Sequence, residues 1–203
     1  TEAPATTVAP ETTTTLPPVP VYPLTGVPVE DPAIAARVAI VVKIGNESAA
    51  NPQTGFNNAD IVFEEIVNDS WTRFAFVFQS MGSDPVGPVR SGRIQDIDLF
   101  GSFNRPLFAW SGGNATVTRA IESSDLIDLN HQRNGNLYYR FSGRKKPSNL
   151  YSNTTQIWER APFGAPPPPQ HFQYRAAGEA PRGVPSSGVS VKREAIGAGG
   201  FWN

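Results

Sequence analysis

Cysteine is absent from this chain of 203 residues, and it holds only two histidines. Without cysteine the chain cannot form a disulfide, a thiolate zinc site or a cysteine nucleophile. His131 and His171 are too few for a histidine metal site, so we expect neither a metal nor a cofactor. A chain without cysteine fits export by a bacterium better than it fits a small, disulfide-stapled eukaryotic module.

Long hydrophobic runs and a large net charge are also missing. No stretch reaches the roughly 18 consecutive apolar residues that would span a bilayer. The chain begins with Thr1, and we expect any signal or membrane anchor to lie upstream of it. The formal net charge is -1 and the pI is about 6.1. Such a chain has no bulk positive field, so nucleic acid is not an expected partner.

The two ends of the chain contain few large apolar groups. Residues 1–21 are rich in threonine, proline and alanine, and we expect a disordered stalk that holds a domain away from a surface. A plain disordered terminus is the alternative. Residues 162–203 predict an irregular, Pro/Gly-rich tail. Because Phe201 and Trp202 would be exposed at its end, we expect a C-terminal domain to follow. Residues 22–161 remain for one domain.

Hydrophobic patterning within residues 22–161 predicts alternating strands and helices. The β-branched run Arg37–Ile44 is typical of a central strand buried on both faces. Two runs separated by three residues, Asp60–Val67 and Trp71–Phe78, predict a hairpin with one aromatic face. Asn114 is a candidate N-cap for a helix. The fold class is therefore α/β or α+β, a single mixed-sheet domain with a few flanking helices. Further strands are expected at 106–111 and 137–141, and further helices near 94–103, 115–122 and 153–158.

The segment Gly87–Arg93, GPVRSGR, carries two arginines and a hydroxyl just before a predicted helix. Arg90, Ser91 and Arg93 are well suited to bind an anion, because a guanidinium presents a planar fork to phosphate or carboxylate and a helix start adds N–H donors. Arg73 and Arg140 would join them if the fold permits. The alternative is that these arginines form structural ion pairs with carboxylates, and the candidates are Glu64, Glu65, Asp96 and Asp98.

Asp60, Glu64 and Glu65 are the carboxylates best placed for acid–base chemistry, because they lie in an apolar strand where burial raises a pKa. Four residues of strand separate Asp60 from Glu64 by roughly 13 Å. That distance is too long for a glycosidase pair, which needs roughly 5 to 9.5 Å. Glu64 would need a carboxylate from elsewhere, and an ion pair between Glu64 and Arg73 is the structural alternative.

Several short motifs follow one another along the chain: PLTG at 23–26, the Val-Lys-Ile strand with Asn46, NPQTG at 51–55, ADIVFE at 59–64, TRF at 72–74, GPVRSGR at 87–93 and PSNLY at 147–151. In this order and spacing they resemble the YerB-like bacterial lipoproteins, a family whose N-terminal domain has no assigned function. The resemblance covers about Tyr22 to Tyr151 and departs at Asn51 and Ser148, where the family tends to have arginine and histidine. It implies a lipid-anchored envelope protein with a smaller second domain.

Three functional hypotheses follow. The first is an extracytoplasmic envelope domain that binds an anionic glycan, phosphate or peptide carboxylate on an envelope polymer or envelope protein, with charged contacts from the arginines and Ser91 and neutral hydrogen bonds from Asn46, Gln53 and Asn149. The second is a hydrolase or transferase acting on an envelope polymer, with Glu64 or Asp60 as the general base. The third is a protein-interaction scaffold without a small ligand. Convergence of the arginines on one pocket without a reactive carboxylate favours binding.

Overall fold

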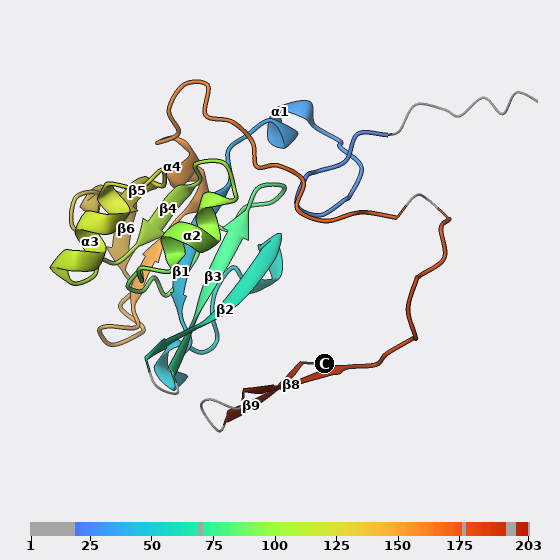
Figure 1. The fold of residues 1–203 in the computed structure, drawn as a ribbon. Helices are drawn as coiled ribbons and strands as arrows, with labels where there is room; N and C mark the ends of the chain where they lie inside the picture. The colour runs from blue at the N-terminus through green and yellow to red at the C-terminus, as the bar shows by residue number, and fades with distance from the viewer. Residues whose placement is uncertain (1–18, 69–70, 176–177, 194–197, 203) are drawn as a thin grey trace, which may run out of the picture.

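The computed structural model describes residues 19–68, 71–175, 178–193 and 198–202 (Figure 1). Most of the expected stalk therefore lies outside the described residues, as do the two residues in the turn of the expected hairpin.

A five-stranded mixed sheet in the order β2-β3-β1-β4-β5 forms the centre of the domain. β1 (Ile40–Gly45) pairs antiparallel with β3 (Trp71–Phe78), and β3 pairs antiparallel with β2 (Ile61–Asn68). On its other side β1 pairs parallel with β4 (Leu107–Trp110), which pairs parallel with β5 (Ile127–Asn130). Every residue of β1 is buried, which confirms the expected central strand, and the whole is a single α+β domain.

Four α-helices lie within the described residues: α1 (Pro32–Ala35), α2 (Asp96–Gly101), α3 (Ala115–Glu122) and α4 (Thr154–Trp158). The Asn114 side chain accepts a hydrogen bond from the Val117 N–H at 2.9 Å, so it caps α3 as expected. The helix expected near 94–103 is present but shorter, because α2 spans only Asp96–Gly101. It therefore starts three residues after Arg93, and Ile94 lies before it and is exposed. The Asp96 carboxylate accepts the Arg93 N–H at 2.7 Å.

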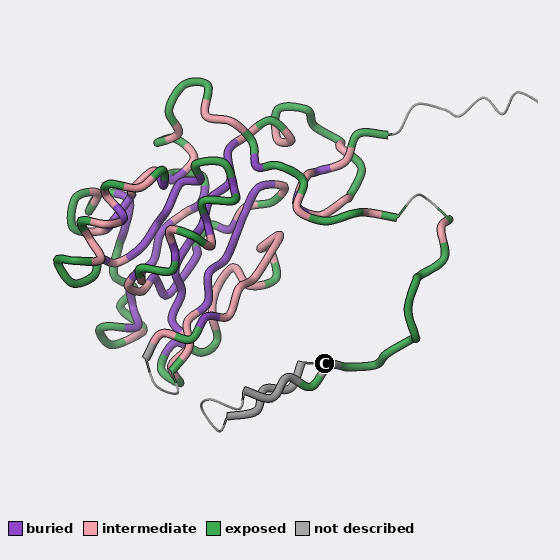
Figure 2. Tube along the Cα trace, viewed as in Figure 1, coloured by how far each residue is buried: buried purple, intermediate pink, exposed green. Residues whose placement is uncertain are grey.

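The sheet is covered on both faces, and β1, β4 and most of β3 form the buried interior in Figure 2, whereas the edge strand β2 is mostly of intermediate burial. Alternation along β3 sends Phe74, Phe76 and Phe78 to one face, which packs on α4 and neighbouring loops. Ala75 and Val77 point to the other face, where α2 and α3 contribute Phe100 and Ile121. The aromatic face of the hairpin therefore meets the core as expected, and the opposite face is buried too.

Smaller elements complete the structure. β6 (Tyr138–Arg140) was expected, and it pairs antiparallel with β7 (Leu150–Ser152), which was not. Three 3-10 helices span Ser48–Ala50, Phe56–Asn58 and Gly135–Leu137. β8 (Val189–Arg193) and β9 (Ala198–Trp202) form a hairpin of their own, apart from the sheet in Figure 1.

Residues 162–175 and 178–188 have the irregular backbone expected of the tail, but the expectation was wrong for the hairpin of β8 and β9. Part of the irregular segment contacts the domain. The His171 ring stacks on Phe103 with centroids 4.3 Å apart. The Tyr174 hydroxyl donates to the Pro23 carbonyl at 2.9 Å. These contacts lay the beginning of the tail against the N-terminal turn, as the neighbouring blue and orange segments of Figure 1 show.

Candidate functional site

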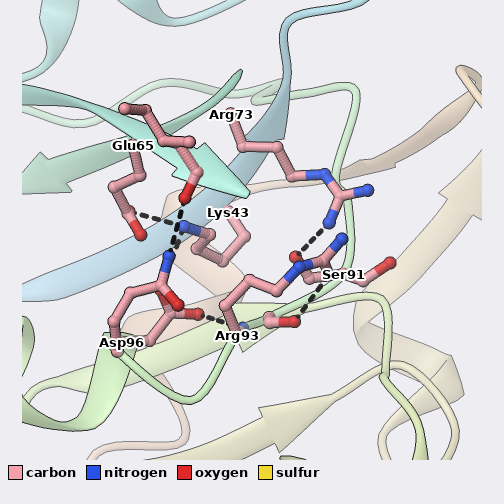
Figure 3. Close-up of polar contacts among 9 residues, drawn as sticks. Lys43, Glu65, Arg73, Ser91, Arg93 and Asp96 are labelled. Atoms are coloured by element: carbon pink, nitrogen blue, oxygen red, sulfur yellow. Dashed lines mark hydrogen bonds and ion pairs between the residues drawn. The ribbon is translucent and has the colours of Figure 1, made fainter. Parts of the chain in front are cut away.

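Three arginines from two segments converge at the carboxyl end of β1. Arg73 comes from β3, whereas Arg90 and Arg93 come from the loop between β3 and α2. Arg73 Nη1 donates to the Ser91 carbonyl at 3.0 Å, and Arg93 Nη1 donates to the Gly92 carbonyl at 2.9 Å (Figure 3). Both guanidinium groups therefore end at the same stretch of loop.

This arrangement concentrates positive charge. Burial, followed by the charges of Arg93 and Arg90, lowers the pKa of Arg73 to about 10. Burial also lowers the pKa of Arg93, although Asp96 opposes the shift. The Arg73 and Arg93 guanidinium groups stay protonated at neutral pH. Their mutual repulsion costs free energy that an anion at the same place would offset.

A pocket of about 230 Å³ lies beside Arg73 and Arg90, and Glu47, Val67, Trp71 and Thr72 line the rest of it. Glu47 Oε1 lies 3.1 Å from Arg90 Nε. Burial works against ionisation of Glu47, but a hydrogen bond from Ser148 and the two arginine charges lower its pKa. A carboxylate with a lowered pKa is a weak general base. Trp71 is 61 % exposed, so a large aromatic surface stands at the rim.

Side-chain hydrogen bonds connect Asn46, Thr72 and Glu64 behind the pocket, and Gln53 lies beside them. Asn46 Nδ2 donates to Thr72 Oγ1 at 2.7 Å, and Thr72 Oγ1 donates to Glu64 Oε1 at 2.7 Å. Gln53 Nε2 donates to the Gly45 carbonyl at 3.0 Å. Asn46 and Glu64 thus orient Thr72, which lines the pocket, whereas Gln53 holds the end of β1.

Asp60 lies away from the arginines, just before β2 begins. Its carboxylate accepts hydrogen bonds from the Gln79 N–H and from the N–H and hydroxyl of Ser80. Burial raises the pKa of Asp60, and these hydrogen bonds oppose the rise. Through these hydrogen bonds Asp60 stabilises the turn after β3.

Arg140 and Asn149 form a pair of their own on β6 and in the residue just before β7. Arg140 Nη1 donates to Asn149 Oδ1 at 2.8 Å, and neither residue lines the arginine pocket. The connection to the pocket is indirect. Ser148, the neighbour of Asn149, donates to Glu47 Oε1 at 2.6 Å.

Residues 24–164 match the family model described as "Protein of unknown function (DUF3048) N-terminal domain". The chain belongs to this family. It is 33% identical over 140 residues to "Putative lipoprotein YerB" of Bacillus subtilis (strain 168), across 68% of this chain and 42% of that protein. The crystal structure of Bacillus subtilis YerB matches with a TM-score of 0.64 and 31% identity, across 68% of this chain and 48% of that one. The chain thus spans less than half the length of these relatives.

The DUF3048 match confirms the YerB-like resemblance, and its range contains the whole arginine pocket. In the part of the chain that the structure describes, no helix combines the length and hydropathy needed to cross a membrane. The same residues hold no group of three or more histidine, cysteine, aspartate or glutamate side chains arranged for a metal ion.

Sequence reasoning missed the group that supports the arginine loop from below. Lys43 is fully buried in β1, with Nζ 2.5 Å from Glu65 Oε1 and 3.1 Å from Asp96 Oδ1. Figure 3 shows this triad beside Arg73 and Arg93. Because the other Asp96 oxygen accepts the Arg93 N–H, the triad holds the loop that carries Arg90 and Arg93.

The charges within the triad do not balance if both carboxyls ionise, since one lysine faces two acids. Burial raises the pKa of Glu65 to about 7, with Lys43 opposing the rise and Asp96 adding to it. Glu65 Oε2 is buried without a hydrogen-bond partner among the described residues. Glu65 therefore takes up a proton near neutral pH. The signal in the sequence was a single lysine inside an otherwise apolar run.

Proposed function

We propose that this domain binds an anionic saccharide group of a cell-envelope polymer in the pocket between Trp71 and the arginines. The observation that carries the proposal is the convergence of Arg73, Arg90 and Arg93 on one loop beside the pocket. Glu47 is the carboxylate that lines this pocket, and its lowered pKa favours binding over acid–base chemistry. Guanidinium groups fixed by backbone carbonyls are preorganised for phosphate or carboxylate.

The exposed indole supports a sugar rather than a bare inorganic anion. Trp71 offers a flat apolar surface at the pocket rim. The apolar face of a sugar ring that covers this surface removes it from water. The Thr72 hydroxyl donates to Glu64 and accepts from Asn46, so its second lone pair can accept a hydrogen bond from a sugar hydroxyl. A ligand with both a ring and a negative charge satisfies all of these groups at once.

The similarity to a protein named as a lipoprotein supports a place outside the cytoplasm. We therefore place the domain at the bacterial envelope, held by an anchor upstream of the chain and a stalk formed by residues 1–21. The relatives extend beyond the matched stretch, and the matching family model describes an N-terminal domain, which together support a second domain in the whole protein.

A titration of the full chain with glucose 1-phosphate, inorganic phosphate and glucose tests this function. Charge-assisted hydrogen bonds contribute about 1.5 to 3 kcal/mol each, so Arg73→Ala or Arg90→Ala should weaken glucose 1-phosphate binding at least roughly tenfold. Trp71→Ala should weaken binding of the sugar phosphate but not of inorganic phosphate. Arg119, exposed on α3, provides the matched control, and Arg119→Ala should bind as the wild type does.

Three further comparisons distinguish the proposed anion site from its alternatives. Arg90→Lys should rescue binding only in part, because an ammonium keeps the charge but loses the planar fork. If Arg73→Ala and Arg90→Ala bind normally and only melt several degrees lower, the arginines are structural and the proposed site is wrong. Glucuronate in place of glucose 1-phosphate distinguishes a carboxylate ligand from a phosphate ligand.

A further inference from the structure

A second and larger pocket opens at the other end of β1. It measures about 520 Å³ and is lined by Arg37, Trp158, Thr155 and the loop Gly82–Asp84, among others. Arg37 precedes β1, whereas the arginine pocket follows its end. Six residues of strand place the two pockets roughly 20 Å apart. The volume lies within the range of about 300 to 1,000 Å³ that is usual for small-molecule sites.

The Arg37 guanidinium is held in place at this pocket. Its Nε donates to the Gln79 carbonyl at 2.5 Å, and its central carbon lies 3.6 Å from the centre of the Trp158 ring. Trp158 is fixed in turn, because its indole N–H donates to the Val38 carbonyl at 3.0 Å. Neither Nη group of Arg37 has a hydrogen bond to a residue that the structure describes. A rigid fork therefore remains available for a carboxylate.

Asp84 gives the same pocket a fixed negative charge. Its Oδ1 accepts hydrogen bonds from the Thr154 hydroxyl and the Thr155 N–H, both at 3.1 Å. These contacts outweigh burial and lower the pKa of Asp84, so the group is ionised at neutral pH. Within the described ranges, neither Asp84 nor Arg37 forms an ion pair. The pocket thus holds one oriented cation and one oriented anion, and neither is part of an ion pair among the described residues. Asp60, which does not line the pocket, stabilises the charge of Arg37 and partly opposes the lowering of its pKa by burial.

We propose that this pocket binds a small zwitterion, an unblocked dipeptide or a free amino acid. The ligand carboxylate binds the two Nη groups of Arg37, and its ammonium group binds Asp84. The side chain between them covers the Trp158 edge. Gly82 keeps this surface open, because a Cβ at Gly82 would lie 2.9 Å from Trp158 Cζ3. The proposal does not depend on the arginine pocket.

A titration of the full chain with alanyl-alanine tests this site. The readout is the NMR chemical shift of the Trp158 indole N–H. Alanine tests the smaller ligand. We expect saturable shifts with alanyl-alanine, and at least roughly tenfold weaker binding when either peptide end is blocked, by acetylation or as an amide. Asp84→Asn should weaken binding of alanyl-alanine and leave the acetylated peptide unchanged. Arg37→Lys should weaken binding of both the free and the acetylated peptide. Because lysine keeps the positive charge, this variant can be used even if removing the charge harms folding.

Arg73→Ala and Trp71→Ala serve as controls for the other pocket and should bind alanyl-alanine as the wild type does. The proposal is overturned if neither alanine nor alanyl-alanine gives a saturable shift, if blocking either end has no effect, or if Asp84→Asn and Arg37→Lys leave the affinity unchanged. A loss caused by Arg73→Ala but not by Arg37→Lys also overturns it, because the peptide would then occupy the arginine pocket.

Discussion

Lys43→Met is the change that tests the buried triad most directly. Methionine nearly matches lysine in length and carries no charge, so the variant leaves Glu65 and Asp96 buried without a cation. Removing one partner of a buried ion pair costs roughly 3 to 5 kcal/mol. At roughly 3 to 5 °C for each kcal/mol in a domain of this size, Tm should fall by roughly 9 to 25 °C.

The loss should also depend on pH. Burial raises the folded-state pKa of Glu65 from its usual 4.5 to about 7, so the folded state holds this proton more tightly than the unfolded state does. The resulting stability is fully present below about pH 4.5 and is lost as the pH rises through about 7. Lys43 opposes the rise, so its removal raises the Glu65 pKa further. The variant should therefore lose more stability at pH 8 than at pH 5.

Urea unfolding of wild type, Lys43→Met and Glu65→Gln at pH 5 and pH 8 measures both effects. Glu65→Gln is the matched control, because it removes the titrating group while Lys43 keeps Asp96 as a partner. Its free energy of unfolding should change less between the two pH values than that of the wild type. The reasoning is refuted if Lys43→Met loses less than about 1 kcal/mol at both pH values, or if its loss is the same at each.

Two further changes test the core and the tail. Phe76 is fully buried, so Phe76→Ala should lower the free energy of unfolding by about 3 to 5 kcal/mol in urea, and a loss under about 1 kcal/mol would contradict its placement. Gly26 has a φ of 72° and its position for a Cβ is occupied by the Tyr174 ring. Gly26→Ala should therefore displace Tyr174 and speed limited proteolysis after residue 161, and an unchanged cleavage pattern would show that the tail is held elsewhere.

Local patterns were enough to predict the elements whose own side chains determine them. β1 and β3 are long β-branched or aromatic runs, and the Asn114 cap of α3 depends on neighbours three residues away. β5 and β7 are as short as β4 and β6, but they were missed because IDLN and LYS lack a run of apolar or aromatic residues such as LFAW in β4. Such short strands are stabilised by pairing with β4 and β6, and pairing is a tertiary property.

The candidate site divides in the same way. Arg90, Ser91 and Arg93 share one segment of sequence, so a local pattern could identify them together. The buried triad depends on sheet register, which places Glu65 opposite Arg73 on β3 and Lys43 opposite Ala75. The start of α2 then brings Asp96 to the same face. No local pattern contains this information, because the triad joins residues 22 and 53 positions apart.

The stacking of Arg37 on Trp158 was even harder to predict from the sequence than the buried triad. The two residues come from opposite ends of the domain, and α4 is brought to β1 by core packing through Ile157. Composition predicted neither partner as a site residue, because each is ordinary in its own segment.

The most direct test of the proposed anion site is an NMR titration of the full chain with glucose 1-phosphate that follows the arginine Nε–Hε resonances. We expect saturable shifts of the Arg73 and Arg90 side-chain resonances with one shared affinity, and none at Arg119. Shifts of equal size at all three arginines, or no saturation at any of them, would contradict a specific anion site in the pocket beside Trp71.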